Sequence, residues 1–308
     1  MTMKAVRIHE YGGPDVLKYE DAPIPDIGPD GVLIRVRAAG VNPVDWKIRK
    51  GMMTAVRPLH FPAVVGADVA GTVERVGVLV NRFKPGNAVV ARVDGAYAEF
   101  AAVKTDAVSP APKSIPLEHA AGLPIAAGTA WTLLFDAAGV APGQRVLVHG
   151  GAGGVGTFAV QFAKLAGLYV IATCSAPNAA LVKSLGADEV IDYRNENFAA
   201  KVKEVDLVLD NVGGQTLKES YRVVRKGGLL LTIASPPDEA LAKQHGIAAR
   251  FERAVVNGIR LQEIGSLIDI GKLRVIVEKE FPLSEAAAAH ELSEAGHVRG
   301  KIILNVAT

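Results

Sequence analysis

The sequence predicts an α/β fold in which a doubly wound parallel sheet is inserted into a mostly β, barrel-like domain. Strand-like and helix-like segments alternate from residue 145 to residue 256, as in parallel sheets that carry helices on both faces. Short β-rich segments spaced by Gly and Pro fill residues 1–110, and the same texture returns near the C-terminus. We therefore expect a discontinuous β domain of residues 1–121 and 272–308, with an α/β domain of residues 122–271 between its two parts.

Composition and length are those of a globular protein that can form two domains. The chain has 308 residues, of which 49% are hydrophobic. Its 34 basic and 32 acidic residues are well mixed and give a formal net charge of +2, so we expect no nucleic-acid partner. A single cysteine, Cys174, excludes an internal disulfide framework and a cysteine-rich metal site. The N-terminus lacks the apolar core of a signal peptide, and no apolar run reaches the ~18–20 residues that span a bilayer, so we expect a soluble cytoplasmic protein with no membrane partner.

The β domain is predicted from short β-rich segments separated by turn signals. These segments cover residues 3–11, 31–41, 69–77 and 87–93. From residue 117 to residue 139, alanines and bulky apolar residues recur at helical spacing, which predicts two helices around Gly128 and Thr129. Near the C-terminus, strand-like stretches over 272–283 and 300–306 flank a helix over 284–295, which returns the chain to the β domain.

The α/β domain is predicted from apolar strands that alternate with helices. Strands are predicted at residues 145–150, 169–174, 189–193, 205–212, 228–234 and 250–256. Helices are predicted between them, among others at 157–166, 177–185 and 214–225.

A glycine-rich turn follows the first of these strands. Gly151-x-Gly153-x-x-Gly156 stands between a strand and a helix, and this order indicates a dinucleotide-binding site. The glycines allow a tight turn, a close approach of the backbone to the pyrophosphate and close helix packing, and the helix N-terminus favours the phosphate charge. We expect Gly151, Gly153, Gly154, Val155 and Gly156 to contact the cofactor; the alternative is a plain glycine-rich connector.

The carboxyl ends of the later strands should border the same ligand, because ligands of open α/β sheets lie outside these ends. Asn211 and Val212 end the fourth strand, and Ile233, Ala234 and Ser235 end the fifth. We expect these residues to lie beside the cofactor.

The choice between NADPH and NADH is read at the end of the second strand. An Asp or Glu about 20 residues past the glycines would bind the ribose 2′-hydroxyl of NAD. The stretch 173–178 contains Thr173 and Ser175 but no carboxylate, and Ser175 can bond a 2′-phosphate. The sequence therefore favours NADPH, with NADH as the less favoured alternative.

Seven segments spread over nearly the whole chain carry a family resemblance. They are AAGVNPVDWKIRKG (38–51), FPAVVGADVAGTVERVG (61–77), AYAEF (96–100), AAGLPIAAGTAWTLL (120–134), VLVHGGAGGVGTFAVQFAKLAG (146–167), GADEVIDY (186–193) and AHELSEAGHVRGKIIL (289–304). In this order they resemble the medium-chain dehydrogenase/reductase superfamily, and within it the zinc-free quinone oxidoreductase (zeta-crystallin-like) branch. The resemblance implies a Rossmann domain inserted into a GroES-like catalytic domain, and it places Tyr193 near the adenosine end of the cofactor.

Departures from the zinc-dependent members of this superfamily exclude their two zinc sites. Asn42 stands where those enzymes place a zinc-ligating Cys, and Gly66-Ala67-Asp68 stands where they have Gly-His-Glu. The lobe of closely spaced cysteines that holds their structural zinc is missing. Because a tetrahedral zinc site needs three or four N, S or O donors placed together, we expect no zinc.

Hydrogen-bond donors must then stabilise negative charge on a substrate oxygen, and the expected catalytic donors are Asn42, Lys47 and Thr129. The resemblance implies that Asn42 faces the nicotinamide and that Thr129 lies beside its ring, with a helix cap as the alternative for Thr129. Lys47 stands where many relatives carry a tyrosine, and its ammonium could bond the substrate oxygen and supply a proton. The alternative for Lys47 is a solvated surface cation. Asp45 is expected to be the N-cap of a short helix and to hold Lys47 in place.

These observations and the resemblance together predict an NADPH-dependent, metal-independent reductase of a quinone or an α,β-unsaturated carbonyl compound. Two alternatives stay open. One is reduction of an enoyl thioester, for which the sequence shows no obvious basic rim. The other is a non-catalytic NADPH-binding protein, crystallin-like or a sensor. We also expect a homodimer.

Overall fold

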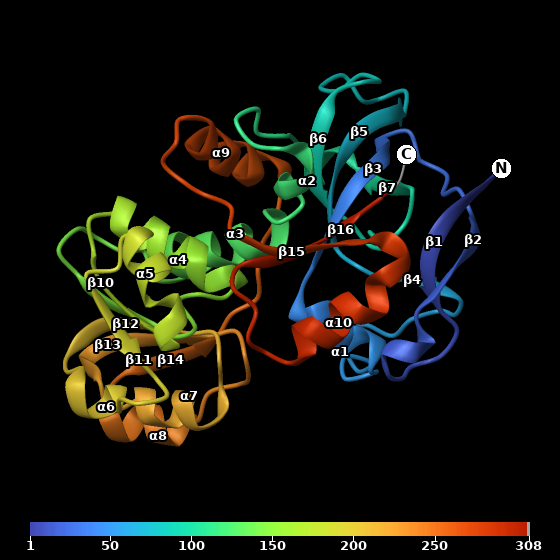
Figure 1. The fold of residues 1–308 in the computed structure, drawn as a ribbon. Helices are drawn as coiled ribbons and strands as arrows, with labels where there is room; N and C mark the ends of the chain where they lie inside the picture. The colour runs from blue at the N-terminus through green and yellow to red at the C-terminus, as the bar shows by residue number, and fades with distance from the viewer. Residues whose placement is uncertain (307–308) are drawn as a thin grey trace. The chain divides into compact units, whose positions relative to one another are not determined.

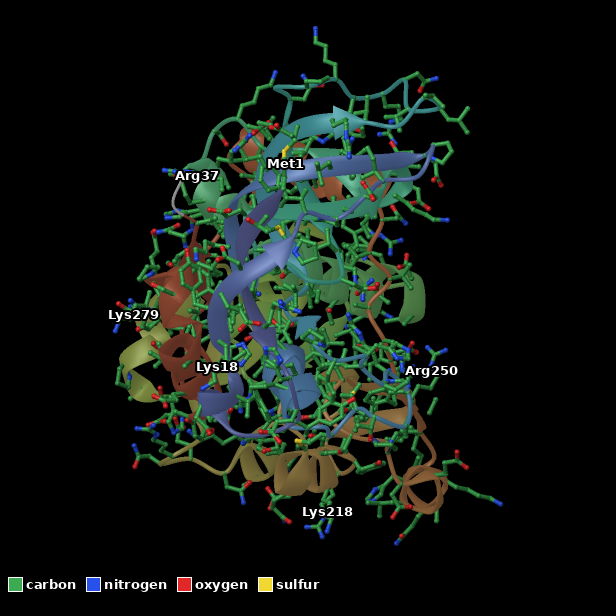
Figure 2. The ribbon with its side chains drawn as sticks, turned by 90° about the vertical axis from the view of Figure 1, so that its right-hand side faces the viewer. Met1, Lys18, Arg37, Lys218, Arg250 and Lys279 are labelled. Atoms are coloured by element: carbon green, nitrogen blue, oxygen red, sulfur yellow. The ribbon has the colours of Figure 1, made fainter. Side chains whose placement is uncertain are left out.

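The computed structural model describes residues 1–306 and divides into two compact units. One unit consists of Met1–Ala126 and Val256–Thr308, and the other consists of Ala127–Val255 (Figure 1). Lys18, Lys218, Arg250 and Lys279 are exposed charged residues on these units (Figure 2). No helix in the described part of the chain is both long and apolar enough to cross a membrane.

The second unit contains a six-stranded parallel sheet in the order β11-β10-β9-β12-β13-β14. Its strands are β9 (Arg145–Val148), β10 (Tyr169–Cys174), β11 (Glu189–Asp192), β12 (Val205–Asp210), β13 (Val224–Thr232) and β14 (Ala248–Phe251). Its helices are α4 (Gly154–Leu165), α5 (Ala179–Ser184), α6 (Phe198–Lys201), α7 (Gly214–Ser220) and α8 (Glu239–His245). This order confirms the predicted doubly wound fold, and its switch point lies between β9 and β12.

The central strands of this sheet form because their apolar runs are buried on both faces. Val146, Leu147 and Val148 of β9 are fully buried, as are Val208 and Leu209 of β12. Helices cover both faces of a parallel sheet, so its strands carry continuous rather than alternating apolar residues. The predicted strand over 250–256 extends only to Phe251.

The first unit contains two β sheets. A seven-stranded sheet has the order β15-β16-β3-β5-β6-β8, with β7 also paired to β3, and a three-stranded sheet has the order β2-β1-β4. The strands are β1 (Thr2–Ile8), β2 (Lys18–Pro23), β3 (Gly31–Val41), β4 (Ala63–Val64), β5 (Asp68–Val76), β6 (Ala88–Arg92), β7 (Phe100–Lys104), β8 (Val108–Pro110), β15 (Val277–Pro282) and β16 (Lys301–Asn305). Strand β16 pairs antiparallel with β3, so the C-terminal part of the chain returns to this unit.

The boundaries of the units differ from those at 121/122 and 271/272 that the sequence suggests. Helix α9 (Gly258–Asp269) belongs to the first unit. A Cβ on Gly258 would lie 2.1 Å from the carbonyl oxygen of Val108 on β8, and Asp269 accepts hydrogen bonds from the backbone N–H groups of Lys113 and Ser114. Its contacts to β8, rather than its place in the chain, decide where α9 belongs.

The remaining helices are α1 (Pro43–Arg49), α2 (Leu117–Ala120), α3 (Pro124–Trp131) and α10 (Ala286–Glu294), and a π-helical turn (Thr132–Ala137) follows α3. The predicted break at Gly128 and Thr129 is wrong, because α3 runs through both residues. The break lies earlier, between Ala120 and Pro124. A proline fits the first turn of a helix, where its missing N–H has no intrahelical partner.

Candidate active site

The glycine-rich turn joins β9 to α4 in a conformation that favours glycine. Gly150 has a positive φ of 67°, and a Cβ on Gly156 would lie 2.0 Å from the carbonyl oxygen of Gly150. A Cβ on Gly151 would lie 2.9 Å from the Cβ of Ala172 on β10. The glycines therefore allow the turn to pack closely against its own helix and the neighbouring strand.

The N-terminus of α4 has room and donors for an anion. Its N-cap, Gly153, has no side chain that could accept a hydrogen bond from the first helical turn. The backbone N–H groups of Gly154, Val155 and Gly156 begin this helix and have no carbonyl one turn earlier within it. These donors and the helix dipole suit phosphate oxygens.

The residues that follow β12 lie beside the same turn. A Cβ on Gly150 would lie 3.4 Å from Cγ2 of Val212, so the ends of β9 and β12 meet at the switch point. Asn211 Nδ2 donates to the carbonyl oxygen of His149 at 2.8 Å, whereas its buried Oδ1 has no hydrogen-bond partner in residues 1–306. Because a buried amide oxygen normally accepts a hydrogen bond, this edge fits a dinucleotide whose carboxamide carries N–H donors.

A buried carboxylate, Asp210, accepts hydrogen bonds that hold the loop after β12 against the end of β13. Asp210 is fully buried and accepts hydrogen bonds from the Gly213 N–H at 3.0 Å and from Thr232 Oγ1 at 2.9 Å. Residues 233–235 follow β13 directly and are half-buried. The cofactor residues predicted after β9, β12 and β13 therefore share the carboxyl edge of one sheet.

His149 supports the glycine turn, although the sequence interpretation did not include it. It is fully buried, with Nδ1 3.2 Å from Thr173 Oγ1 and Nε2 3.0 Å from Ser220 Oγ. Burial lowers the pKa of His149 to about 3, so the ring is neutral at pH 7. Ser220 donates its own hydrogen to the carbonyl oxygen of Thr216, so Ser220 accepts from the His149 Nε2–H and Thr173 donates to Nδ1. Thr173 Oγ1 also accepts from the Gly150 N–H at 3.3 Å, so this side chain holds the turn.

Ser175 and Tyr193 follow two neighbouring strands, β10 and β11. The Tyr193 N–H donates to the carbonyl oxygen of Cys174 at 3.2 Å, which brings the two strand ends together. The guanidinium of Arg194 lies 5.8 Å from the centroid of the Tyr193 ring. A cation is thus present at this edge, on the neighbouring strand end rather than directly after Ser175. Burial raises the pKa of the Cys174 thiol to about 11, in agreement with a packed and unreactive residue.

Asn42 is the N-cap of α1 in the other unit, and its side chain is only 3% exposed. Its Nδ2 donates to Asp68 Oδ2 at 2.9 Å and to the Gly40 carbonyl oxygen at 3.4 Å, and its Oδ1 accepts from Lys301 Nζ at 2.5 Å. The carboxylate must accept and the ammonium must donate, so the orientation of the amide is defined. Both amide hydrogens of Asn42 are therefore engaged within the protein.

Lys301 and Asp68 form a buried ion pair next to Asn42. Lys301 is 3% exposed, Asp68 is fully buried, and Nζ lies 3.4 Å from Oδ2. Burial raises the pKa of Asp68, and Lys301 opposes this rise. The sequence interpretation assigned Lys301 only to the packing of the C-terminal tail. The sequence feature that could have indicated this role is a lysine that directly precedes the apolar residues 302–304, which the structure shows to be buried in β16.

A chain of buried hydrogen bonds extends from Asp45 to Arg49. Asp45 Oδ2 accepts from the Asn42 N–H at 2.8 Å and from the Tyr97 hydroxyl at 3.0 Å. The Tyr97 hydroxyl lies 3.1 Å from His290 Nε2, and His290 Nδ1 lies 3.2 Å from Arg49 Nη1. Arg49 can only donate, so His290 Nδ1 accepts and Nε2–H donates to Tyr97. Asp45 is the third residue of α1 rather than its N-cap, and its carboxylate caps the Asn42 N–H.

Lys47 and Thr129, the other two predicted catalytic residues, lie in different units. Lys47 is half-buried on α1, and its Nζ lies 5.6 Å from the centroid of the Trp46 ring. In the described part of the chain, the Lys47 ammonium forms no ion pair, so Asp45 does not hold it in place as expected. Thr129 is 4% exposed in the middle of α3, which removes the helix-cap alternative.

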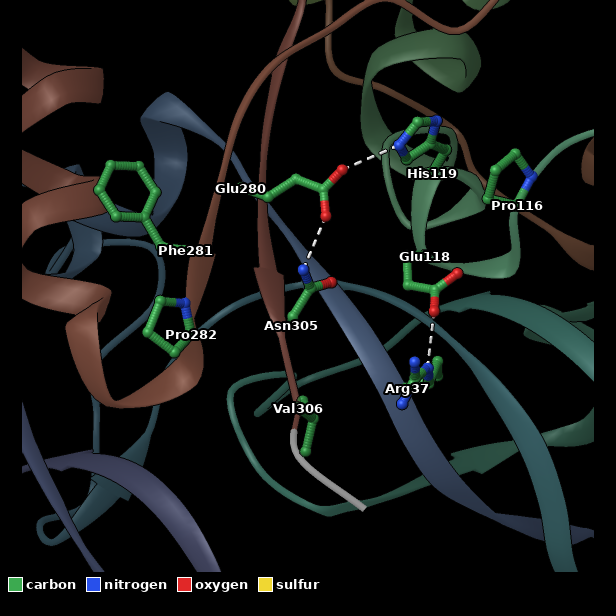
Figure 3. Close-up of a pocket in the computed structure, with 9 residues that line it drawn as sticks. All are labelled: Arg37, Pro116, Glu118, His119, Glu280, Phe281, Pro282, Asn305 and Val306. Atoms are coloured by element: carbon green, nitrogen blue, oxygen red, sulfur yellow. Dashed lines mark hydrogen bonds and ion pairs between the residues drawn. The ribbon is translucent and has the colours of Figure 1, made fainter.

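A groove on the first unit contains none of the predicted site residues. It has a volume of about 630 Å³ and is lined by residues of α2, β15 and β16 (Figure 3). Its polar side chains bond one another: His119 Nε2 lies 2.9 Å from Glu280 Oε1, and Arg37 Nε donates to Glu118 at 2.7 Å. Within residues 1–306, no three His, Cys, Asp or Glu side chains are grouped so that they could hold a metal ion.

Comparisons with known proteins agree with this arrangement. The chain matches family models described as zinc-binding dehydrogenase (residues 185–304) and alcohol dehydrogenase GroES-like domain (residues 28–113). It is 37% identical to the mitochondrial NAD(P)H oxidoreductase RTN4IP1 of Mus musculus, over 99% of this chain and 89% of that protein.

Two solved structures extend the comparison to the fold. The quinone oxidoreductase of Coxiella burnetii has a TM-score of 0.92 and 34% identity, and the match covers 100% of both chains. The Escherichia coli quinone oxidoreductase complexed with NADPH has a TM-score of 0.90 and 28% identity over 98% of this chain and 99% of that one. With the inserted parallel sheet, the glycine turn and the returning C-terminal strand, these similarities show that the chain is an oxidoreductase of the medium-chain dehydrogenase/reductase superfamily, in its quinone oxidoreductase branch.

Proposed function

We propose that this protein uses NADPH to reduce a small quinone or an α,β-unsaturated carbonyl compound, without a metal ion. The observation that supports the proposal most is the glycine turn with its uncapped helix N-terminus, beside the unpartnered Oδ1 of Asn211. When bound there, NADPH supplies a hydride to the acceptor. Relatives named NAD(P)H oxidoreductase and quinone oxidoreductase support the same reaction class.

Asn42 at the start of α1, Lys47 on α1 and Thr129 on α3 take different roles in the proposed reaction. Both amide hydrogens of Asn42 are engaged by Asp68 and Gly40. We therefore assign Asn42 to shaping the wall that faces the nicotinamide, and we assign the stabilisation of a substrate oxygen to Lys47, with Thr129 as a further hydroxyl donor. An ammonium without an ion-pair partner in the described residues can bond a developing oxyanion and release a proton to it.

An acceptor screen separates this proposal from its alternatives. The purified protein is mixed with NADPH and offered a quinone, an alkenal and an enoyl thioester, and NADPH oxidation is followed by absorbance. We expect turnover of the quinone or the alkenal. Turnover of the thioester alone would favour the enoyl-thioester reductase, and NADPH binding with no turnover of any acceptor would favour a binding protein.

A carboxylate at the end of β10 should shift the cofactor preference towards NADH. Ser175→Asp places a negative charge where the 2′-phosphate is expected, and the clash should weaken NADPH binding by about 1–3 kcal/mol, about ten- to a hundredfold. Arg194 over the Tyr193 ring supports a site for that phosphate. The measurement is kcat/KM for NADPH and NADH in both proteins. Ser184→Asp, on the exposed surface of α5, controls for the added charge. A wild-type enzyme that uses both cofactors equally would contradict the NADPH preference.

Removal of metal ions should leave the activity unchanged. Asn42 and Ala67 stand at the positions of zinc ligands in the zinc-dependent relatives; Ala67 offers no donor atom, and the Asn42 amide is hydrogen-bonded to Asp68 and Lys301. Prolonged chelation, an activity assay and elemental analysis test the claim. Activity that is lost and then restored by stoichiometric zinc would overturn it.

A homodimer and a cytoplasmic location stay predictions from the sequence. Light scattering of the purified protein tests the first, and localisation of the tagged protein tests the second. The mouse relative is named as mitochondrial, so a signal in an organelle is the outcome that would contradict the second prediction.

A further inference from the structure

Among the described residues, one oxygen of Asp45 has no hydrogen-bond partner, although the residue is only 1% exposed. Oδ2 accepts two hydrogen bonds, from the Asn42 N–H and the Tyr97 hydroxyl, whereas the buried Oδ1 accepts none in the described part of the chain. A buried carboxylate oxygen without a donor is strongly unfavourable. A water molecule or a proton is therefore expected at Oδ1.

Asp45 also lines a small cavity. It has a volume of about 70 Å³ and is lined by Asp45 and Ile48 of α1, by Leu59 and Val64, and by Arg57 and Asp94. This is enough room for at least one water molecule, which needs about 10–15 Å³ on this measure. Arg57 Nη2 donates to Asp94 Oδ1 at 2.5 Å, and their side chains are 30% and 69% exposed. The cavity therefore reaches from a buried acid to a solvated ion pair.

On its opposite side, Asp45 contacts a chain of buried groups. The chain through Tyr97 and His290 leads to the Arg49 guanidinium, which pairs with Glu294 and cannot release a proton in the accessible pH range. Asp68 and Lys301 lie within electrostatic range of Asp45, and both are buried. The cavity, lined in part by the exposed side chain of Asp94, offers the more direct path from Asp45 to solvent.

The charges around Asp45 favour a proton on it near neutrality. Burial and the neighbouring Asp68 carboxylate raise the pKa of Asp45 to about 7, although Lys301 and the hydrogen bonds from Asn42 and Tyr97 act in the opposite direction. The groups that face it are Asn42 on its own helix, Asp68 on β5, Lys301 on β16, Tyr97 with His290 and Arg49 behind it, and Arg57 and Asp94 at the cavity.

We propose that water in this cavity connects Asp45 to the solvent, and that Asp45 gains and loses a proton through it. The exchange changes the charge in the first turn of α1, two residues before Lys47. This last consequence rests on the proposed function, in which Lys47 bonds the substrate oxygen. The water-linked acid itself does not depend on it.

Infrared spectroscopy of the unliganded protein tests the site without any assay of turnover. We expect a carboxylic-acid C=O band that disappears with a midpoint near neutral pH, shifts in D₂O within the mixing time and is missing in Asp45→Asn. Asp106→Asn, which changes an exposed acid of the same unit, should leave the band in place. Val64→Phe, which fills the cavity and keeps the acid, should slow the deuterium exchange at least tenfold.

A band that is missing in the wild type, or one that Asp45→Asn does not remove, would overturn the proposal. Exchange that is equally fast in Val64→Phe would overturn the cavity as its route. The pH profile of kcat then tests the consequence for α1: a midpoint near neutrality should be present in the wild type and shifted by Asp45→Asn. A protein that shows the band but reduces no acceptor would contradict the proposed function and would still support the proton-exchange site.

Discussion

Lys47→Ala is expected to lower kcat by about 10²–10³-fold, or ~2.7–4 kcal/mol, while the Kd for NADPH stays nearly unchanged. The Lys47 ammonium is half-buried on α1 and has no ion-pair partner among residues 1–306. If it bonds the oxygen on which charge develops, its removal raises the energy of the transition state and leaves the cofactor bound as before. Single-turnover kinetics and fluorescence titration with NADPH separate the two effects.

Lys50→Ala is the matched control for this variant. The Lys50 ammonium lies 5.3 Å from the centroid of the same Trp46 ring and pairs with Glu294. Because Lys50 is a partly exposed cation, its removal should change the activation free energy that kcat reports by no more than about 0.5 kcal/mol. Lys47→Tyr should recover part of the rate, because a phenol can donate the same bond. A folded Lys47→Ala enzyme with full activity would pass the role to Thr129.

Lys301→Met is expected to reduce the free energy of unfolding by about 3–5 kcal/mol, because it leaves the buried Asp68 carboxylate without its cation. The same substitution releases Asn42 Oδ1 from the lysine ammonium, so kcat should fall as well. Urea denaturation measures the first effect, and kcat at saturating NADPH measures the second. Arg299→Met, two residues earlier and partly exposed, controls for the loss of a positive charge.

The double variant Asp68→Asn with Lys301→Met tests the cause of the instability. Removing both charges should restore most of the lost stability, since no uncompensated ion then stays buried. The pH dependence has a defined sign. Burial already raises the pKa of Asp68, and the loss of Lys301 raises it further. The deficit of Lys301→Met should therefore shrink as pH falls and Asp68 takes up a proton. A deficit that is independent of pH would point to lost packing instead.

The order of secondary structure and the cofactor turn followed from local sequence. Continuous apolar runs such as 146–148, bounded by turn residues, are typical of buried strands of a covered sheet, and the strand–glycine–helix order at 151–156 has few structural solutions. Residues 31–41 form one strand with the predicted bounds because their apolar pattern ends at turn signals on both sides. The sequence also showed that the zinc ligands of the zinc-dependent relatives are replaced, because this depends only on the identity of single residues such as Asn42.

Contacts between residues far apart in the sequence were determined only by the tertiary structure. Lys301 lies 259 residues from Asn42 in sequence, and only the pairing of β16 with β3 brings its ammonium to the amide. Arg194 approaches the predicted phosphate end from the neighbouring strand, and α9 joins the first unit through contacts with β8. Burial also matters for Asp45. In the sequence, an Asp at a helix start indicates an ordinary cap. Its enclosure among Tyr97, Asp68 and a small cavity, which only the tertiary structure shows, makes Asp45 a group that can hold a proton at neutral pH. Local sequence encodes backbone preference, whereas the electrostatics of a site depend on which distant side chains share the same low-dielectric space.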